Sequence, residues 1–364
     1  MVYALVRPLF FAFPPSWAHS LAMLGLGPLE HSAALRRIFG VDQTAFDPRL
    51  TVHTLGLNFA HPVGLAAGFD KNAKRVRALG ALGFSHLEIG TVTAQAQSQN
   101  PPPNLFRLPD DLALVNRLGF PNDGAASVIA RLRDRGASVP IGISIGKSRA
   151  VDIDPLEPAI ADYVTSFCLA RAALKSLPGF VVVNVSSPNT KNLRAMQNAE
   201  VARNLLHSIA AENKGDPRVP ILLKVAPDLD DAGLESLLEV VDESGIDGVV
   251  ATNTTISREG LATGADRIAK IGAGGLSGAP LQARALEVVK RTRARLGSKK
   301  TVIGVGGVSD AASTLAMLRA GADLVQIYTG FIYGGPFIAA TIAREISLEM
   351  DRSGAKSLSE LTRS

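Results

Sequence analysis

The sequence predicts an α/β fold, a (β/α)8 TIM barrel preceded by an N-terminal α-helical arm. Short apolar runs alternate with helical patterns along most of the 364 residues. Eight such pairs over roughly 290 residues match the order and size of this barrel. Polar residues and glycines follow the apolar runs, which is where such barrels place their active sites.

The expected strands are short, apolar and rich in β-branched residues, as in sheets buried on both faces. They cover residues 63–68, 86–91, 141–145, 180–186, 221–225, 248–253, 302–306 and 324–328. The expected helices cover residues 71–82, 122–135, 155–177, 199–212, 230–244, 281–296, 310–320 and 336–349. A doubly wound Rossmann sheet is the alternative, but no stretch has the Gly-x-Gly-x-x-Gly spacing that it requires.

We divide the chain into a helical arm over residues 1–45, a barrel domain over 46–350 and a polar tail over 351–364 that we expect to fray. Two short helical pieces are expected in the arm, where Trp17, Leu21 and Leu24 form one apolar stripe. No apolar run of the arm reaches the ~18 residues that span a bilayer, and a signal peptide fits poorly. Two interpretations remain open: the arm packs on the barrel, or it lies on a membrane with a slot between its helices for an apolar ligand.

Composition excludes several classes of function. The net charge of +5 is mild and compatible with anionic ligands or an anionic membrane surface. Four tyrosines and one tryptophan argue against an aromatic platform for nucleic acid. The single Cys168 excludes an intrachain disulfide and a cysteine-based zinc site, and the six histidines lack metal-ligand spacing. We therefore expect a protein of the cytosolic side without a bound metal or nucleic acid.

The fourth expected strand leads into the richest polar cluster. Its apolar run ends in Asn184, Ser186, Ser187, Asn189 and Thr190, and Pro188 forces this segment out of the sheet. A charged Lys224 inside the apolar fifth strand needs an electron-rich partner in the barrel mouth. Glycine turns after the last two strands are typical of phosphate binding through backbone N–H groups. Two long insertions, residues 95–122 and 254–278, belong to the same face and are expected to act as lids.

A series of motifs from about residue 55 to 337 resembles dihydroorotate dehydrogenase, in order along the chain. They are Ala67-Gly-Phe-Asp-Lys71, Glu88-Ile-Gly-Thr-Val-Thr93, Leu105-Phe-Arg-Leu108, Asn116-Arg-Leu-Gly-Phe120, Asn184-Val-Ser-Ser-Pro-Asn-Thr190, Lys224-Val-Ala-Pro-Asp228, Ala251-Thr-Asn-Thr-Thr255, Gly274-Gly-Leu-Ser-Gly278, Ile303-Gly-Val-Gly-Gly307 and Gln326-Ile-Tyr-Thr-Gly-Phe331. The arm resembles that of the membrane-associated, quinone-using class 2 branch. Class 1 enzymes lack the arm and use a cysteine base, where this chain has Ser187.

The resemblance implies a flavoprotein that binds FMN and oxidises (S)-dihydroorotate to orotate in de novo pyrimidine synthesis. A membrane quinone would accept the electrons. The arm implies peripheral contact with lipid at the cytoplasmic face of a bacterial cell membrane. Ser187 would remove the C5 proton, with Thr190 in its proton relay and Lys224 at the N1/O2 edge of the flavin.

The remaining roles also come from the resemblance. The expected substrate-binding residues are Lys71, Asn116, Arg117, Leu118, Gly119, Phe120, Asn184, Asn189, Asn253 and Thr254. The expected FMN-binding residues are Ala67, Gly68, Phe69, Asp70, Lys71, Thr91, Ser144, Asn184, Lys224, Thr252, Gly278, Gly307, Tyr328 and Thr329. His19 and Arg107 would border the quinone tunnel.

The residue types suit this chemistry. Dihydroorotate is an amide-rich anion, so asparagine side chains can pair with its N–H and C=O edges. A serine is a poor base at neutral pH, so Ser187 needs a proton relay and a lid that excludes solvent. Ser144 departs from the family, which usually has an asparagine there, and the shorter side chain leaves that contact bridged by water or lost.

Two alternatives remain. A different FMN barrel oxidoreductase would share the fold, but the four asparagines argue against another substrate. A silent, membrane-attached binding protein would lack Ser187 or Lys224, and both are present.

Overall fold

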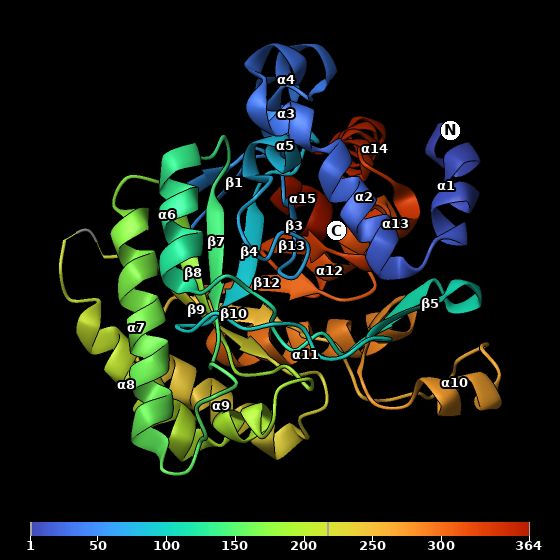
Figure 1. The fold of residues 1–364 in the computed structure, drawn as a ribbon. Coiled ribbons are helices and arrows are strands. Elements are labelled where there is room, and N and C mark those ends of the chain that lie inside the picture. Colours follow the sequence, from blue (N-terminus) through green and yellow to red (C-terminus); the bar gives the residue numbers. More distant parts are fainter. Residues whose placement is uncertain (1, 217, 364) are drawn as a thin grey trace.

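A closed barrel of parallel strands forms the centre of the molecule (Figure 1). The computed structural model describes residues 2–216 and 218–363. Within them, eight strands follow one another around the barrel in chain order, so the predicted fold is confirmed. The barrel strands are β3 (Val63–Leu65), β4 (Leu87–Val92), β7 (Ile141–Ile145), β8 (Gly179–Asn184), β9 (Ile221–Val225), β10 (Gly248–Ala251), β12 (Thr301–Val305) and β13 (Leu324–Ile327).

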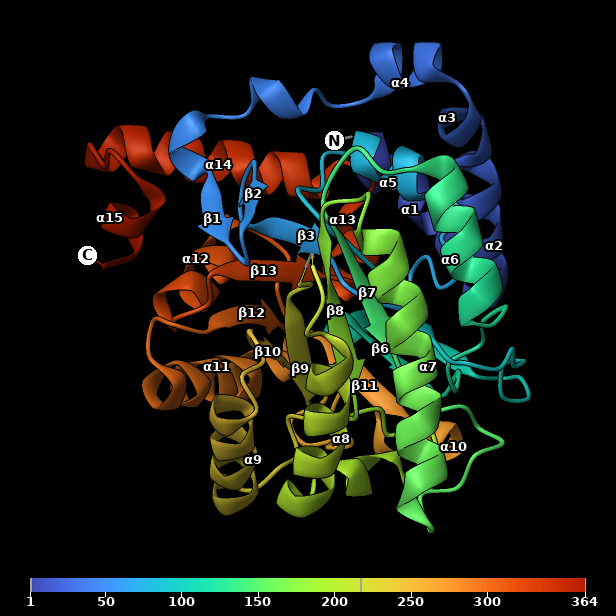
Figure 2. The same cartoon turned by 90° about the vertical axis from the view of Figure 1, so that its left-hand side faces the viewer.

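Helices cover the outside of the barrel, and α6, α7, α8 and α9 lie side by side there (Figure 2). The main barrel helices are α5 (Val76–Ala81), α6 (Ala125–Arg135), α7 (Leu156–Leu174), α8 (Ala199–Glu212), α9 (Asp231–Glu243), α11 (Gln282–Leu296), α12 (Ala311–Arg319) and α14 (Ile338–Ser353). Their predicted bounds differ from these by a few residues. The largest difference is at α5, because the Asp70 carboxylate accepts hydrogen bonds from the N–H groups of Lys74 and Arg75 and holds the preceding residues in a loop.

The lower half of the barrel is apolar. A hairpin of β1 (Val52–Thr54) and β2 (Leu57–Phe59) closes the amino-terminal end, with Phe59 fully buried against inward-facing residues such as Phe180 and Leu222. Side chains along a strand alternate between faces, so Lys224, two positions after Leu222, and Asn184, four positions after Phe180, also point inward. The apolar layer therefore forms the floor beneath a buried polar layer at the mouth.

The two insertions build one roof over that mouth. Strands β5 (Leu105–Leu108) and β6 (Ala113–Asn116) come from the first insertion, and β11 (Gly275–Gly278) comes from the second. They pair as an antiparallel sheet in the order β11-β6-β5, and helix α10 (Ala265–Ile271) flanks it. The expectation that both insertions cover the same face is confirmed. The short helix α13 (Thr329–Gly334) follows the last barrel strand.

The arm contains four helices rather than two. They are α1 (Val2–Ala12), α2 (Pro15–Gly25), α3 (Gly27–His31) and α4 (Ala33–Phe39), with α2 beside the roof strand β5 (Figure 1). Prolines at helix starts divide this segment, because Pro15 and Pro28 each lie in a first turn, where a missing N–H costs little. Among the described residues, no helix is both long and apolar enough to cross a bilayer.

Over residues 351–363, which the structure describes, two helical segments account for most of the C-terminal tail, so the expectation of fraying is wrong there. Helix α14 continues to Ser353, and a further helix, α15 (Leu358–Arg363), follows. Leu358 and Leu361 are buried in the outer core, and Leu361 accepts a hydrogen bond from Arg319 of α12. Two apolar residues at i and i+3 are enough to dock this otherwise polar segment.

The arm is anchored to the barrel domain by a buried carboxylate. Glu30 of α3 is 1% exposed, accepts hydrogen bonds from the N–H groups of Arg77 and Ala78 at 3.0 Å each, and pairs with Arg135 at 3.1 Å. Replacing Glu30 by leucine should lower the free energy of unfolding by roughly 3 kcal/mol, because it leaves two N–H groups without an acceptor and Arg135 with only the carbonyl of Lys74. Denaturant unfolding measures this loss. Glu243→Leu, which breaks the exposed pair with Arg203, serves as the control and should cost ~1 kcal/mol at most. Equal losses in the two variants would contradict the anchoring role.

Candidate active site

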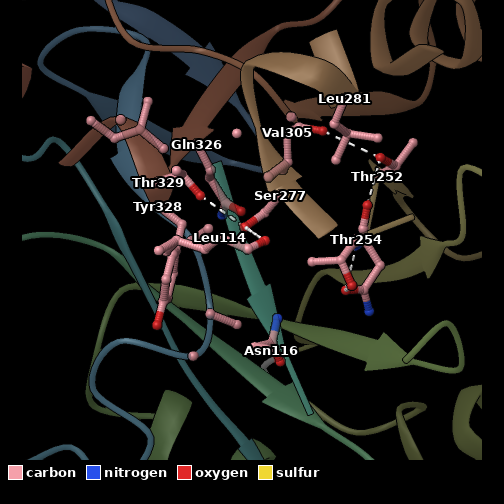
Figure 3. Close-up of a pocket in the computed structure, with 18 of the residues that line it drawn as sticks. Leu114, Asn116, Thr252, Thr254, Ser277, Leu281, Val305, Gln326, Tyr328 and Thr329 are labelled. Carbon is pink, nitrogen blue, oxygen red and sulfur yellow. Dashed lines mark hydrogen bonds between the residues drawn. The ribbon is translucent and has the colours of Figure 1, made fainter. Parts of the chain in front are cut away.

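A cavity opens at the carboxyl-terminal ends of the barrel strands, under the roof sheet (Figure 3). The structure brings most of the predicted site residues together on its wall. These are Ala67, Gly68, Lys71, Thr91, Asn116, Leu118, Gly119, Phe120, Asn184, Ser187, Asn189, Lys224, Thr252, Asn253, Thr254, Gly278, Gly307, Tyr328 and Thr329. Leu105, Leu112 and Leu114 of the roof insertion add an apolar side to the same wall.

Four asparagine side chains from different elements meet at this cavity. Asn189 donates to the Oδ1 of Asn116 at 3.1 Å, which joins the loop after β8 to the roof strand β6. Asn253 donates to the Oδ1 of Asn184 at 3.4 Å, and Asn184 donates to the hydroxyl of Thr91 at 2.9 Å. The cluster therefore presents several amide donors and acceptors to one space, which suits a ligand with amide-like edges.

The hydroxyl of Ser187 lies in the cavity wall and is nearly buried, at 5% exposure of the residue. Its Oγ accepts a hydrogen bond from the backbone N–H of Asn189 at 3.2 Å. A donor aimed at this oxygen stabilises negative charge that develops when the hydroxyl loses its proton. Thr190 lies behind the wall, and its buried Oγ1 has no hydrogen-bond partner in the described part of the chain.

The buried charge of Lys224 has an acidic partner, as its position in the strand predicts. Its Nζ lies 3.3 Å from the Oε1 of Glu88, and the two side chains are 6% and 0% exposed. Glu88 was missed as a site residue, although its place in the alternation of β4 turns it toward the barrel interior. The second carboxylate oxygen of Glu88, Oε2, has no hydrogen-bond partner within the described residues, so the pair leaves an acceptor free in the polar layer at the cavity floor.

Lys71 brings a second cation to the cavity wall, where its Nζ donates to the carbonyl of Gly68. Burial lowers the pKa of Lys71 to about 8, while the nearby Asp70 opposes this shift. An anion bound beside the ammonium group would favour its charged form. Lys71 is therefore suited to a carboxylate or another anionic ligand.

Gly278 and Gly307 form two turns at which the backbone can come close to a ligand in the cavity. Gly278 and Gly307 have φ angles of 106° and 73°. A Cβ at Gly278 would lie 2.3 Å from the carbonyl oxygen of Leu112, and one at Gly307 would lie 2.3 Å from the Cβ of Gln282. No other residue fits these two turns without a shift of backbone, and such turns after the last strands of a barrel suit a phosphate.

Two polar side chains beside these turns, Ser277 and Gln326, were missed from the sequence, whereas Thr252, Thr254 and Thr329 were predicted. Figure 3 shows Gln326, Ser277 and Thr329 grouped on one side of the cavity, with Thr252 and Thr254 on the other. Thr329 donates to the Oγ of Ser277 at 2.8 Å. Gln326 is fully buried, and neither polar atom of its amide has a partner within the described residues. An amide left in this state inside a cavity wall indicates a ligand with polar groups.

His19 and Arg107 connect the arm to the cavity without lining it. The His19 ring packs edge-on against Phe69 at 5.0 Å, and Phe69 packs in the same way against Tyr328 at 6.3 Å. Burial lowers the pKa of His19 to about 4, so its ring is neutral at pH 7. Arg107 donates to the carbonyls of Phe11 and Phe13 at 3.3 and 2.8 Å, so it caps the end of α1.

Other predicted residues also stand behind the cavity wall. Arg117 donates to the carbonyls of Ile271 and Ala273 at 2.6 and 3.2 Å, so it ties the two insertions together instead of facing a ligand. Ser144 bonds Thr91 through their hydroxyls at 2.9 Å, and its short side chain ends there. Phe69 packs between His19 and Tyr328, and the Asp70 carboxylate accepts the N–H groups of Lys74 and Arg75. These four, with Thr190, support the wall rather than form it.

Metal ligands are not grouped in the described parts of the chain: no three His, Cys, Asp or Glu side chains gather to hold an ion.

Tyr328 remains a neutral phenol at pH 7, because burial raises its pKa to about 12. The polar chemistry of the cavity therefore comes from amides, hydroxyls and two lysines.

The known proteins to which this chain is similar in sequence carry the same family description. The family model described as dihydroorotate dehydrogenase matches residues 49–350. Proteins named dihydroorotate dehydrogenase (quinone) are similar along nearly the whole chain. The one from Thermobifida fusca is 47% identical, covering 94% of this chain and 91% of the relative. The one from Nocardia farcinica is 46% identical, covering 99% and 96%.

Solved structures show the same relationship. The ligand-free DHODH from Eimeria tenella superposes with a TM-score of 0.83 at 31% identity, covering 95% of this chain and 98% of that one. The crystal structure of DHODH from the same organism in complex with ferulenol gives a TM-score of 0.81 at 31% identity, covering 96% and 94%. On sequence, fold and the placement of the site motifs, the chain belongs to the dihydroorotate dehydrogenase family.

Proposed function

We propose that this protein oxidises (S)-dihydroorotate to orotate with FMN as its resident cofactor and passes the electrons to a membrane quinone. This reaction is the redox step of de novo pyrimidine synthesis. The observation that carries the proposal is the cluster of four asparagines beside the buried Ser187, above the Lys224–Glu88 pair. The name shared by the relatives supports the same substrate and acceptor.

The substrate fits the asparagine cluster by its hydrogen-bonding pattern. Dihydroorotate has two amide-like edges and a carboxylate, and the side chains of Asn116, Asn184, Asn189 and Asn253 offer both donors and acceptors. Lys71 supplies the cation for the carboxylate. Burial under the roof sheet strengthens each of these polar contacts, because little bulk water competes for them.

The residues present also fit FMN. Gly278, Gly307 and Thr329 would hold the phosphate, while Lys224 and Gln326 would meet polar groups of the ring system or its side chain. Bound there, FMN would supply the acceptor for the hydride that leaves C6 of the substrate. Glu88 keeps the ammonium of Lys224 in the polar layer, and a fixed cation favours a neighbouring group that gains negative charge.

Ser187 is proposed to take the proton from C5. Its Oγ already accepts the N–H of Asn189, which lowers the cost of charge on that oxygen. Thr190 lies three positions further along the same loop, and its buried, unpartnered hydroxyl is suited to pass the proton onward through a water. The roof sheet keeps this relay apart from bulk solvent.

The arm is proposed to rest on the membrane surface and to guide the quinone. Leu5, Leu9, Trp17 and Leu24 are 66–81% exposed, which favours the membrane interpretation over simple packing. The other side of the arm meets the cavity wall through His19 and Phe69. We place the protein at the cytoplasmic face of the membrane as a peripheral protein.

The function is tested by steady-state turnover. Purified protein loaded with FMN should form orotate from dihydroorotate when a short-chain quinone is added, and should not do so at a comparable rate with NAD or fumarate. Orotate is followed by its ultraviolet absorption. Turnover with NAD or fumarate and none with quinone would contradict the proposed acceptor.

Removing the base should slow the chemistry without removing the cofactor. Ser187→Ala should retain FMN and lower the rate of flavin reduction by dihydroorotate roughly 10²- to 10⁴-fold, the usual scale for general-base catalysis. Stopped-flow absorbance measures that rate. Ser176→Ala, which removes a hydroxyl bonded to the carbonyl of Ala173 near the start of β8, is the control and should behave as the unmodified protein. An unchanged rate in Ser187→Ala would exclude Ser187 from proton removal.

Binding of orotate should weaken at alkaline pH. The pKa of Lys71 is about 8 when no anion is bound, so a rise in pH above that value removes the charge that binds the carboxylate. The dissociation constant should then increase about tenfold per pH unit, since each unit lowers the charged fraction tenfold. Titration of the FMN-loaded protein with orotate from pH 6 to 10 gives the profile. Lys71→Met should bind weakly with no such dependence, and a flat profile in the unmodified protein would contradict the role of Lys71.

The exposed apolar residues of the arm are tested by a double substitution. Leu9→Ser combined with Trp17→Ser should weaken binding to lipid vesicles and raise the KM for a long-chain quinone, because both side chains are surface groups that would enter the lipid. Flavin reduction by dihydroorotate should not change. Leu348→Ser on α14, which is 53% exposed, is the control. Vesicle binding and quinone KM equal to those of the control would leave the arm with a packing role alone.

A further inference from the structure

One arginine contacts the loops that follow three successive barrel strands. Arg194 lies in the short helix η4 (Leu193–Gln197), after β8. Its Nε donates to the carbonyl of Ser186 at 3.1 Å, and its Nη2 donates to the carbonyl of Thr254, after β10, at 3.0 Å. Its Nη1 pairs with the carboxylate of Asp228, after β9, at 2.8 Å.

Asp228 holds the same region from its other side. Besides Arg194, its carboxylate accepts hydrogen bonds from the hydroxyl of Thr255 and from the backbone N–H of Ile256, at 3.2 and 3.3 Å to its two oxygens for the latter. The loop after β10 is thus fixed at Thr254 through Arg194 and at the next two residues through Asp228. The two side chains are 23% and 18% exposed, so solvent screens their attraction only in part.

Both of these attachment points adjoin residues of the cavity wall. Ser186 directly precedes Ser187, and Thr254 directly follows Asn253 and lies in the wall itself. A side-chain hydrogen bond joins the same two loops, since Asn253 donates to the Oγ of Ser186 at 3.0 Å. Arg194 and Asp228 are absent from the described cavity lining, so they act from behind it.

We propose that Arg194 and Asp228 are a positioning pair that sets the distance between the Ser187 loop and the Asn253–Thr254 loop. The inference rests on the proposed function for its catalytic consequence, but the contacts themselves do not depend on it. The planar guanidinium can reach two carbonyls and a carboxylate at once, which a lysine ammonium on a flexible stem cannot do with the same geometry. The pair therefore aligns the base with the amides that hold the substrate.

The test compares Arg194→Met with a matched arginine at the opposite end of the barrel. Arg218 pairs with Asp247 at 2.7 Å and donates to the carbonyl of Gly245 at 3.0 Å, before β10 begins. Both variants should keep FMN and be reduced by dithionite like the unmodified protein. Arg194→Met should lower the rate of flavin reduction by dihydroorotate by roughly 10- to 100-fold, the scale of a misplacement near 1 Å. Arg218→Met should leave that rate unchanged.

Two further readouts separate positioning from a loss of fold. Hydrogen exchange in Arg194→Met should become faster in residues 186–192 and 254–258, and Arg218→Met should leave both segments protected. Arg194→Lys, which keeps the charge next to Asp228, should restore part of the rate. The proposal is overturned if the rate and exchange of Arg194→Met match those of the control, or if its rate falls only in proportion to lost FMN. Failure of the proposed function is distinct, since the unmodified FMN-loaded protein would then not be reduced by dihydroorotate, and the exchange data would still decide whether the pair holds the loops.

Discussion

The buried ion pair between Lys224 and Glu88 is the constraint on which the active site depends. An ammonium group inside a barrel loses its hydration, and a carboxylate at 3.3 Å makes that position tolerable. The apolar layer around Phe59 and Phe180 closes the barrel below, so the charges mark the level at which the interior becomes polar. Lys224 and Gln326 line the cavity at this level, and the asparagine cluster and Ser187 also face it. Removing either partner alone would leave an unpaired charge in the interior.

The two insertions and the arm turn this barrel mouth into an enclosed cavity. Strands of both insertions pair into a single roof, and Arg117 joins them through carbonyls of the second insertion. The arm then packs beside the roof, with Arg107 bonded to the end of α1 and Glu30 bonded to the start of α5. The asparagine cluster and the arm thus lie on different sides of one wall, which suits the proposed separation of substrate chemistry from electron transfer to quinone. Phe69 packs between His19 of the arm and Tyr328 of the cavity wall.

Local patterns of the sequence predict the barrel and most of the cavity wall, because strand periodicity and polar strand ends depend on residues that are close together in sequence. Partners that are distant in sequence escape such patterns: Glu88 lies 136 positions from Lys224, and only the closed barrel brings them together. Gln326 was missed because one polar residue inside an apolar strand looks like an ordinary variation. Arg117 matched the family motif, yet its long side chain reaches backbone outside the cavity. The C-terminal helix was missed because two buried leucines are a weak signal in a polar segment.

Anaerobic mixing decides whether the cavity joins a reducible flavin to dihydroorotate. Protein purified with FMN is mixed with dihydroorotate in the absence of oxygen and of any quinone, while the visible absorption band of the flavin is recorded. We expect the band to disappear and one orotate to form per flavin, followed by recovery of the band when quinone is added. A flavin that stays oxidised in the presence of saturating dihydroorotate would exclude this substrate.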